Sequence, residues 1–326
     1  MEEQQLFQQR TDLSGLQSAV DNLKNEIGKV IVGQDMMIEL LLAGLLADGH
    51  VLIEGVPGVA KTLTAKLLAR AVSTGFSRIQ FTPDLMPSDV TGTAVFNPKE
   101  TVFQFKPGPI FSNIILIDEI NRAPAKTQAA LFEVMEERQV TVDGSTYPLE
   151  MPFMVVATQN PIEQEGTYHL PEAQLDRFLF KINVTYPTRE EELKVLMHHH
   201  TTSLPNMIYE VQPVLSAQEL KSLREQVRNI HVEEKLLQFI TSIVLSTRNN
   251  KNIYLGASPR ASIGILNGAK ALAAMRGRDF VTPDDIVQVA PAVLRHRIVI
   301  TPEKEMEGST ADNVIEQLIQ AVEIPR

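Results

Sequence analysis

The sequence of 326 residues contains no cysteine and no tryptophan. Without cysteine the chain has no disulfide bridge, no thiolate nucleophile and no cysteine-ligated metal. It also lacks an apolar run long enough to cross a bilayer, since the longest extends only from Ile38 to Ala47. The first residues are polar and acidic. We therefore expect no secretion signal, no insertion into a membrane and a cytoplasmic location.

An excess of basic residues is also absent. The chain has 30 lysine and arginine residues against 40 aspartate and glutamate residues, which gives a formal net charge of −10. This balance disfavours sequence-independent binding of nucleic acid, although it does not exclude a local basic channel. The 44% of hydrophobic and 21% of charged residues are typical of globular proteins, and the length suggests two domains.

A glycine-containing segment between a predicted strand and a predicted helix indicates nucleotide binding. It reads Gly55-Val-Pro-Gly-Val-Ala-Lys-Thr62 and precedes a helical pattern at Lys61–Ser73. Small residues let backbone amides converge on phosphate oxygens, a lysine neutralises them, and a hydroxyl can reach Mg²⁺. The residues that we expect to bind the nucleotide here are Gly55, Val56, Pro57, Gly58, Val59, Ala60, Lys61, Thr62 and Leu63.

Ala60 departs from the general phosphate-loop motif, which has glycine before the lysine. Alanine fits this position if the backbone is close to helical. We expect it to be excluded if the position requires a positive φ angle, because its Cβ atom disfavours that conformation.

Five short apolar runs alternate with helical patterns in the first part of the chain. Such runs predict an α/β fold in which a parallel sheet is covered by helices on both faces. Ligands of these sheets bind at the carboxyl ends of the strands. The runs are Val51–Ile53, Arg78–Phe81, Ile114–Ile117, Phe153–Thr158 and Leu179–Val184.

Two segments interrupt this alternation and are predicted to be insertions. Residues 91–111 contain two β-type stretches, and residues 139–149 have the pattern of a hairpin that turns at Asp143-Gly144. After Arg189 the pattern is of helices only, with a capping box at Ser216–Glu219 and an N-cap at Thr282. We therefore predict a core domain at 1–190 and an all-α lid domain at 191–326.

Polar side chains follow two of the apolar strands. Asp118 and Glu119 end one of them, and adjacent residues of a strand point to opposite sides. Asp118 is therefore placed to hold Mg²⁺ together with the Thr62 hydroxyl, and Glu119 to polarise the attacking water. Asn160 follows another strand, where it can hydrogen-bond the γ-phosphate or the water.

Phosphoryl transfer needs further positive charge, and the sequence offers two candidate arginines. Arg177 either reaches a phosphate or forms an ion pair with Asp176 or Glu172. Arg260 begins a helix of the second domain and is either a phosphate ligand or a solvated residue. Arg122 either acts across a subunit interface or forms an ion pair within the chain. We expect the histidines at 198–200 to form a solvated helix end, because consecutive helical residues cannot share one metal.

The order of these motifs resembles that of the AAA+ ATPases, and most closely that of the MoxR family. The resemblance covers nearly the whole chain. The motifs that carry it are Val32-Gly-Gln34, Gly55-Val-Pro-Gly-Val-Ala-Lys-Thr62, Asp118-Glu-Ile-Asn-Arg-Ala-Pro124, Ala157-Thr-Gln-Asn-Pro161, Leu170-Pro-Glu-Ala-Gln-Leu-Asp-Arg-Phe178 and Ser258-Pro-Arg260.

The resemblance implies a Rossmann-like ATPase core with a helical lid, assembled as a ring that is usually a hexamer. It implies that Asn160 is sensor 1, that Arg260 is sensor 2, and that Arg177 is an arginine finger acting on ATP of the neighbouring subunit. Residues 91–111 correspond to the helix-2 insert and residues 139–149 to the pre-sensor-1 hairpin. The adenine pocket implied by the family includes Val32, Gly33 and Gln34.

The function implied by the resemblance is ATP-driven remodelling of client proteins. MoxR-like proteins are chaperones in the assembly of protein complexes, including metal cofactor insertion, and work with a partner bearing a von Willebrand factor A domain. The alternatives are a nucleic-acid motor and a chelatase-type subunit. The first insertion carries only Lys99 and Lys106 as cations, which disfavours nucleic acid. No Asn-Lys-x-Asp sequence is present to read guanine, so we expect ATP rather than GTP.

Overall fold

The computed structural model describes residues 12–161, 168, 170–201 and 208–325 of the chain. They form two compact units: a core unit of residues 23–221, and a C-terminal unit in which residues 222–325 cluster with residues 12–22. The division between the two units lies at 221/222, whereas the domain boundary expected from the sequence is at 190/191 and stays a prediction. One reason for the later division is that the segment after residue 208 is bound to the core, where Arg70 Nε donates to the Val211 carbonyl at 2.6 Å and Val214 N to the Ala71 carbonyl at 2.7 Å.

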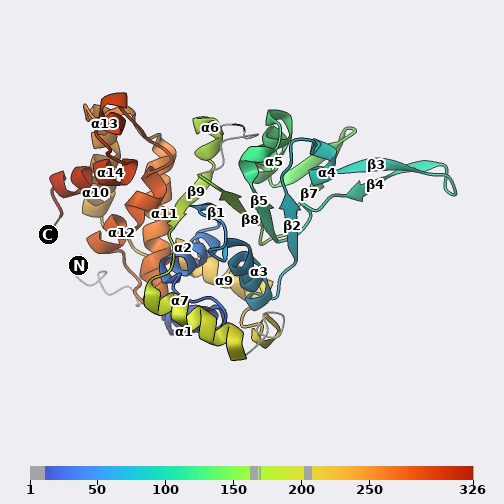
Figure 1. The fold of residues 1–326 in the computed structure, drawn as a ribbon, viewed down its shortest axis with the longest axis horizontal. Helices are drawn as coiled ribbons and strands as arrows, with labels where there is room; N and C mark the ends of the chain where they lie inside the picture. Colours follow the sequence, from blue (N-terminus) through green and yellow to red (C-terminus); the bar gives the residue numbers. More distant parts are fainter. Residues whose placement is uncertain (1–11, 162–167, 169, 202–207, 326) are drawn as a thin grey trace, which may run out of the picture. The chain divides into compact units, whose positions relative to one another are not determined.

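A five-stranded parallel sheet forms the centre of the core unit (Figure 1). The strands lie in the order β2-β5-β8-β1-β9, so β8 separates the strand before the phosphate loop from the strand that ends in Asp118. The five strands expected from the sequence are confirmed, with ends shifted by at most two residues. Their bounds are β1 (His50–Gly55), β2 (Phe76–Gln80), β5 (Ile114–Asp118), β8 (Met154–Gln159) and β9 (Phe178–Val184).

Helices cover both faces of this sheet. All side chains from Ile114 to Ile117 are fully buried, on whichever face they lie, which explains the unbroken apolar character of the strands. Helix α2 contacts β1 and β9, and α3 contacts β2 and β5. The helices of the core unit are α2 (Asp35–Leu46), α3 (Lys61–Ala71), α4 (Pro87–Thr91), the 3₁₀ helix η2 (Ile120–Arg122), α5 (Ala125–Glu137), α6 (Glu172–Leu175) and α7 (Arg189–Thr201).

Both predicted insertions are antiparallel hairpins. Strands β3 (Gly92–Asn97) and β4 (Val102–Pro107) form the one that projects from the core unit in Figure 1. Strands β6 (Gln139–Val142) and β7 (Ser145–Pro148) form the other, and its two turn residues have positive φ angles, 50° at Asp143 and 78° at Gly144. The hairpins contact each other, because the Phe105 ring stacks on Tyr147 with centroids 4.1 Å apart.

The C-terminal unit is mainly helical, as expected, but the expectation of helices alone missed a small antiparallel sheet. Its strands, β10 (Ile253–Leu255) and β11 (Val299–Ile300), are too short to give an apolar run that stands out in the sequence. Helices α1 (Ser14–Gly28) and α9 (Ala217–Arg228) cross the divisions between the units. The other helices are α10 (Glu234–Asn249), α11 (Pro259–Met275), α12 (Pro283–Leu294), α13 (Pro302–Met306) and α14 (Ala311–Ala321).

A buried ion cluster fixes the start of α12. The Thr282 N-cap forms the predicted cap with Asp285, whose side chain is fully buried. Arg276 Nη1 donates to Asp285 Oδ1 at 2.8 Å, and Arg278 Nη2 donates to the same oxygen at 2.7 Å. Two cations thus compensate one buried carboxylate.

Within the described residues, no helix is both long and apolar enough to span a membrane.

Candidate nucleotide site

The phosphate-binding loop connects β1 to α3 at the carboxyl edge of the sheet. Gly58 has a φ angle of 87°, a conformation that favours glycine, and α3 begins at Lys61. The Lys61 ammonium donates a hydrogen bond to the Gly55 carbonyl and so lies folded over the loop. The first turn of α3 offers its N–H groups and the positive end of the helix dipole to an anion at this loop.

Ala60 adopts a left-handed conformation, with φ 60° and ψ 17°. Our expectation that a positive φ would exclude alanine from this position was therefore wrong. The strain costs about 1–2 kcal/mol for a residue with a Cβ atom, and neighbouring contacts hold it in place. The Ala60 carbonyl accepts hydrogen bonds from the backbone N–H of Thr64 at 2.9 Å and from its hydroxyl at 3.0 Å.

Asp118 lies beside the phosphate loop at the end of β5. The Thr62 hydroxyl is 3.4 Å from Asp118 Oδ1 and 3.5 Å from Oδ2, and the Thr158 hydroxyl donates to Oδ1 at 3.1 Å. Asp118 is buried, with 6% of its surface exposed. A hydroxyl and a carboxylate this close are the oxygen ligands that Mg²⁺ takes beside a phosphate, so the residues expected to hold the metal fit it.

Glu119 has different surroundings from Asp118. It too is left-handed, with a φ angle of 57°, and its backbone N–H donates to the Thr158 hydroxyl at 3.1 Å. Its Oε2 atom accepts a hydrogen bond from Gln80 Nε2 at 2.9 Å and forms an ion pair with Arg122 Nε at 2.8 Å. Arg122 thus forms an ion pair within the chain, which was one of the two alternatives that the sequence allowed.

The sequence analysis did not identify two residues of β2 that lie at this site. Arg78 Nε forms an ion pair with Asp118 Oδ2 at 2.6 Å, and Gln80 contacts Glu119. Strand β2 pairs with β5 so that Gln80 lies opposite Asp118. The signal was present as an alternation of polar and apolar residues in Arg78-Ile79-Gln80, but it has meaning only when the strand order is known.

The three remaining candidate residues lie in different places. Asn160 is buried, with 8% of its surface exposed, and directly follows β8, the strand between β1 and β5. Arg177 lies just before β9, and its ion pair is with Glu136 of α5, at 2.9 Å, rather than with Asp176 or Glu172. Arg260 is exposed in the first turn of α11, in the C-terminal unit, so its role stays a prediction.

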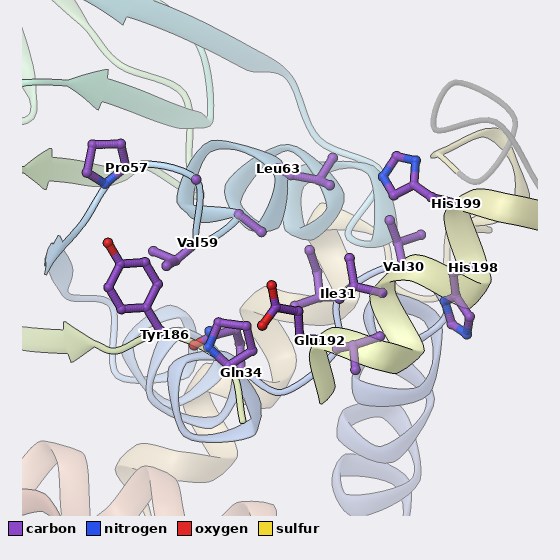
Figure 2. Close-up of a pocket in the computed structure, with 15 residues that line it drawn as sticks. Val30, Ile31, Gln34, Pro57, Val59, Leu63, Tyr186, Glu192, His198 and His199 are labelled. Carbon is purple, nitrogen blue, oxygen red and sulfur yellow. The ribbon is translucent and has the colours of Figure 1, made fainter. Parts of the chain in front are cut away.

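A cavity of about 420 Å³ adjoins the phosphate loop (Figure 2). Of the three residues expected in the adenine pocket, Val32 and Gln34 line it. Gly33 does not line the cavity but has a φ angle of 74°, and a Cβ atom there would lie 2.5 Å from the Glu191 side chain. The lining residues are Val30, Ile31, Val32, Gln34, Pro57, Gly58, Val59, Ala60, Leu63, Tyr186, Pro187, Glu192, Val195, His198 and His199.

Helix α7 and the segment before it form one wall of this cavity, which the sequence interpretation missed. Figure 2 shows Tyr186 near Val59 and Gln34, and the histidines at the opposite end near Val30. His198 and His199 line the cavity, yet His199 and His200 are exposed and His198 is half-buried, as expected for a solvated helix end. A mostly apolar cavity with a few polar groups, open to a phosphate loop, has the size and chemistry to hold a nucleotide base.

Comparisons with known proteins identify the family. Residues 50–180 match the model of the ATPase family associated with various cellular activities (AAA), and residues 245–318 match that of the AAA lid domain. The chaperone MoxR1 of Mycobacterium tuberculosis is 46% identical over 324 residues, which cover 96% of this chain and 85% of MoxR1. The chain belongs to the MoxR family of AAA+ ATPases. Nucleotide binding is thus a family property that the site geometry accommodates.

Two further proteins are similar to this chain over nearly its whole length. The uncharacterised protein YeaC of Bacillus subtilis is 48% identical over 299 residues, 92% of each chain. The crystal structure of a candidate ATPase from Cytophaga hutchinsonii has a TM-score of 0.88 and 44% identity, and the match covers 96% of this chain and 97% of that one. The predicted fold class, an AAA+ core followed by an all-α lid domain, is therefore confirmed, apart from the short β10–β11 sheet in the C-terminal unit.

Proposed function

We propose that this MoxR-family protein hydrolyses ATP with Mg²⁺ and uses the reaction to remodel client proteins. The observation that carries the proposal is the convergence of Lys61, Thr62, Asp118 and Glu119 at one edge of the sheet. The distances between the Thr62 hydroxyl and the Asp118 carboxylate, 3.4 and 3.5 Å, fit joint oxygen ligation of one small cation.

The residues of the site divide the work of hydrolysis. The phosphate loop and Lys61 bind the triphosphate, and Val32, Gln34 and Tyr186 border the cavity for the base. Mg²⁺ held by Thr62 and Asp118 would neutralise phosphate charge during the transfer. Glu119 orients and polarises the attacking water, and Asn160 positions the water or the γ-phosphate.

Two arginines complete the site in this proposal. Arg177 donates to the nucleotide of a neighbouring copy, which requires assembly of the chain as a ring, and Arg260 reaches the γ-phosphate from the lid. An inserted arginine contributes on the order of 10³–10⁵ in rate. We further propose a hexameric ring in the cytoplasm and a partner with a von Willebrand factor A domain. These proposals rest on the family.

The chaperone role rests on the name of the relative MoxR1 and on the two hairpins of this chain. Cycles of binding and hydrolysis alter the arrangement of a ring, and exposed hairpins are suited to transmit this to a bound protein. We propose that this remodelling serves the assembly or maturation of protein complexes, including the insertion of metal cofactors.

Calorimetry with ATP and Mg²⁺, followed by steady-state hydrolysis, tests the enzymatic part. We expect Lys61→Ala to lose binding, and Glu119→Gln to keep binding while its turnover falls about 10²-fold or more. Lys66→Ala, which removes an exposed charge of the same helix, is the control. The proposal fails if the parent protein does not bind ATP at millimolar concentration, or if Glu119→Gln turns over ATP at the parent rate.

Mixed assemblies test the action of Arg177 on a neighbour. Lys61→Ala chains have an intact arginine, and Arg177→Ala chains have an intact phosphate loop. Mixing the two impaired variants is expected to recover hydrolysis beyond that of either variant alone, and no recovery would contradict action between subunits. The Glu119→Gln variant, loaded with ATP, is expected to retain client proteins that Lys61→Ala does not. Strong stimulation by single-stranded DNA that weakens with salt would favour a nucleic-acid motor instead.

A further inference from the structure

Two acceptors on one helix hold the guanidinium of Arg177. Its Nη1 atom donates to the Phe132 carbonyl at 2.9 Å and to Glu136 Oε2 at 2.9 Å. Phe132 and Glu136 are four residues apart on α5 and therefore lie on the same face of the helix. The Nε and Nη2 atoms of Arg177 form no hydrogen bond with any residue that the structure describes.

Both acceptors belong to well-anchored parts of the core unit. The Phe132 ring packs edge-on against Phe178, the residue after Arg177, with centroids 5.9 Å apart. Helix α5 ends at Arg138, which is left-handed with a φ angle of 53°. The Arg138 guanidinium donates to the Asp48 carboxylate at 2.7 Å and to its carbonyl at 3.1 Å. Glu136 thus lies in the last turn of a helix whose C-terminal end is held in place by Arg138.

We propose that Glu136 is a positioning residue for Arg177. By engaging Nη1, Glu136 and the Phe132 carbonyl fix the plane of the guanidinium and leave Nε and Nη2 to donate to the phosphate oxygens of a nucleotide bound by a neighbouring copy. Arginine can bind two phosphate oxygens at once through such a pair of donors. This inference rests on the proposed action of Arg177 between subunits.

The Glu136–Arg177 pair acts by orienting the guanidinium and adds little to the stability of the fold. The Arg177 side chain is 28% exposed and that of Glu136 is 42% exposed, so water screens their attraction. Restricting a long side chain before it binds reduces the entropy lost on binding. A rate effect of about three- to tenfold is therefore expected, smaller than the effect of removing Arg177 itself.

Single and double substitutions measured on the assembled protein test the proposal. Glu136→Ala is expected to lower kcat about three- to tenfold, with KM for ATP and the calorimetric affinity unchanged within about twofold. Glu136→Gln keeps an oxygen that can accept from Nη1, so its kcat should lie closer to that of the parent. Glu136→Lys should lower kcat further, since it repels the guanidinium. Glu133→Ala, which removes an exposed charge of the same helix, should match the parent.

The double variant separates positioning from a structural role. In the Arg177→Ala background, Glu136→Ala should cause no further loss, because the group it orients is gone. A similar loss in both backgrounds, or a kcat for Glu136→Ala equal to or above that of the parent, would overturn the inference. Where Arg177→Ala keeps only a small residual rate but the Glu136 variants are not impaired, only the inference fails. If Arg177→Ala itself hydrolyses ATP normally, the proposed action of Arg177 and this inference fail together.

Discussion

Gln80 of β2 donates a hydrogen bond from Nε2 to Oε2 of Glu119 at 2.9 Å, across two neighbouring strands of the central sheet. The same oxygen is 2.8 Å from Arg122 Nε. The Glu119 oxygen that would face an attacking water thus accepts one hydrogen bond and also lies in an ion pair. A carboxylate held in this way is a weaker hydrogen-bond acceptor for water than a free one, because its charge is already shared.

Removal of the Gln80 donor is expected to raise the basal rate of ATP hydrolysis. Glu119 is partly exposed, so the lost hydrogen bond should change the barrier by about 1 kcal/mol, which corresponds to roughly a fivefold change in rate. We expect this rise for Gln80→Ala, measured as kcat without a client. Gln104→Ala, an exposed glutamine of the β4 strand, serves as the control. A tenfold fall in kcat for a folded Gln80→Ala protein would contradict the prediction.

Arg78 is expected to compete with Mg²⁺ for Asp118. Its Nε atom is 2.6 Å from Oδ2, and the Arg78 side chain is 54% exposed, so the pair contributes about 1 kcal/mol or less. Arg78→Ala should therefore lower the Mg²⁺ concentration needed for half-maximal nucleotide binding about two- to fivefold. A fluorescent ATP analogue titrated with Mg²⁺ gives this value, and Lys66→Ala should not change it. An unchanged or higher Mg²⁺ requirement in Arg78→Ala would show that the two cations do not compete.

The strain at Ala60 predicts that glycine stabilises the protein at this position. Ala60→Gly relieves about 1–2 kcal/mol of backbone strain but adds freedom to the unfolded chain, so a net gain of up to about 1 kcal/mol is expected. Ala129→Gly, at an exposed position inside α5, should lose about 1 kcal/mol. Thermal denaturation without nucleotide measures both changes. Equal losses in the two variants would mean that the positive φ of Ala60 is not retained in solution.

Stability at low pH is expected to depend on Asp285. Burial raises the pKa of this carboxyl, but hydrogen bonds from Arg278 and Thr282 outweigh it, so the pKa lies below its ordinary value of 3.8. A carboxyl whose folded pKa is depressed contributes stability that is present above its unfolded pKa. That contribution is lost as the pH falls through the lower folded pKa.

Asp285→Asn should therefore remove this acid-dependent part of the stability and, at neutral pH, cost about 2–4 kcal/mol by removing the buried carboxylate that Arg276 and Arg278 share. Chemical denaturation followed by circular dichroism between neutral pH and pH values below 3.8 measures both effects. Asp284→Asn, at the exposed neighbouring position, is the control. The prediction is wrong if both variants retain the acid dependence of the parent.

The parts of the fold that depend on local pattern could be predicted from the sequence. Continuous apolar runs located every strand of the central sheet, and Asp143-Gly144 located the turn of a hairpin whose φ angles are both positive. The phosphate loop was recognisable because its chemistry lies within eight consecutive residues, Gly55 to Thr62. These features need no knowledge of which elements become neighbours.

Features that arise from spatial proximity could not be predicted in the same way. Arg78 and Gln80 reach Asp118 and Glu119 only because β2 is the neighbour of β5, a fact about strand order. His198 and His199 line the cavity because the last turn of α7 lies against it. The partner of Arg177 is likewise a residue of another helix, Glu136, instead of the sequence neighbours that local spacing suggested.

The stacked rings of Phe105 and Tyr147 have a consequence for any attempt to shorten this protein. They belong to two different inserted hairpins, so deleting residues 92–107 would leave the Tyr147 ring uncovered in water. The deletion would therefore also remove a packing partner of the β6–β7 hairpin. A loss of client remodelling after such a deletion could be assigned to the missing β3–β4 hairpin only if a full-length chain with Tyr147 replaced by a polar residue kept that function.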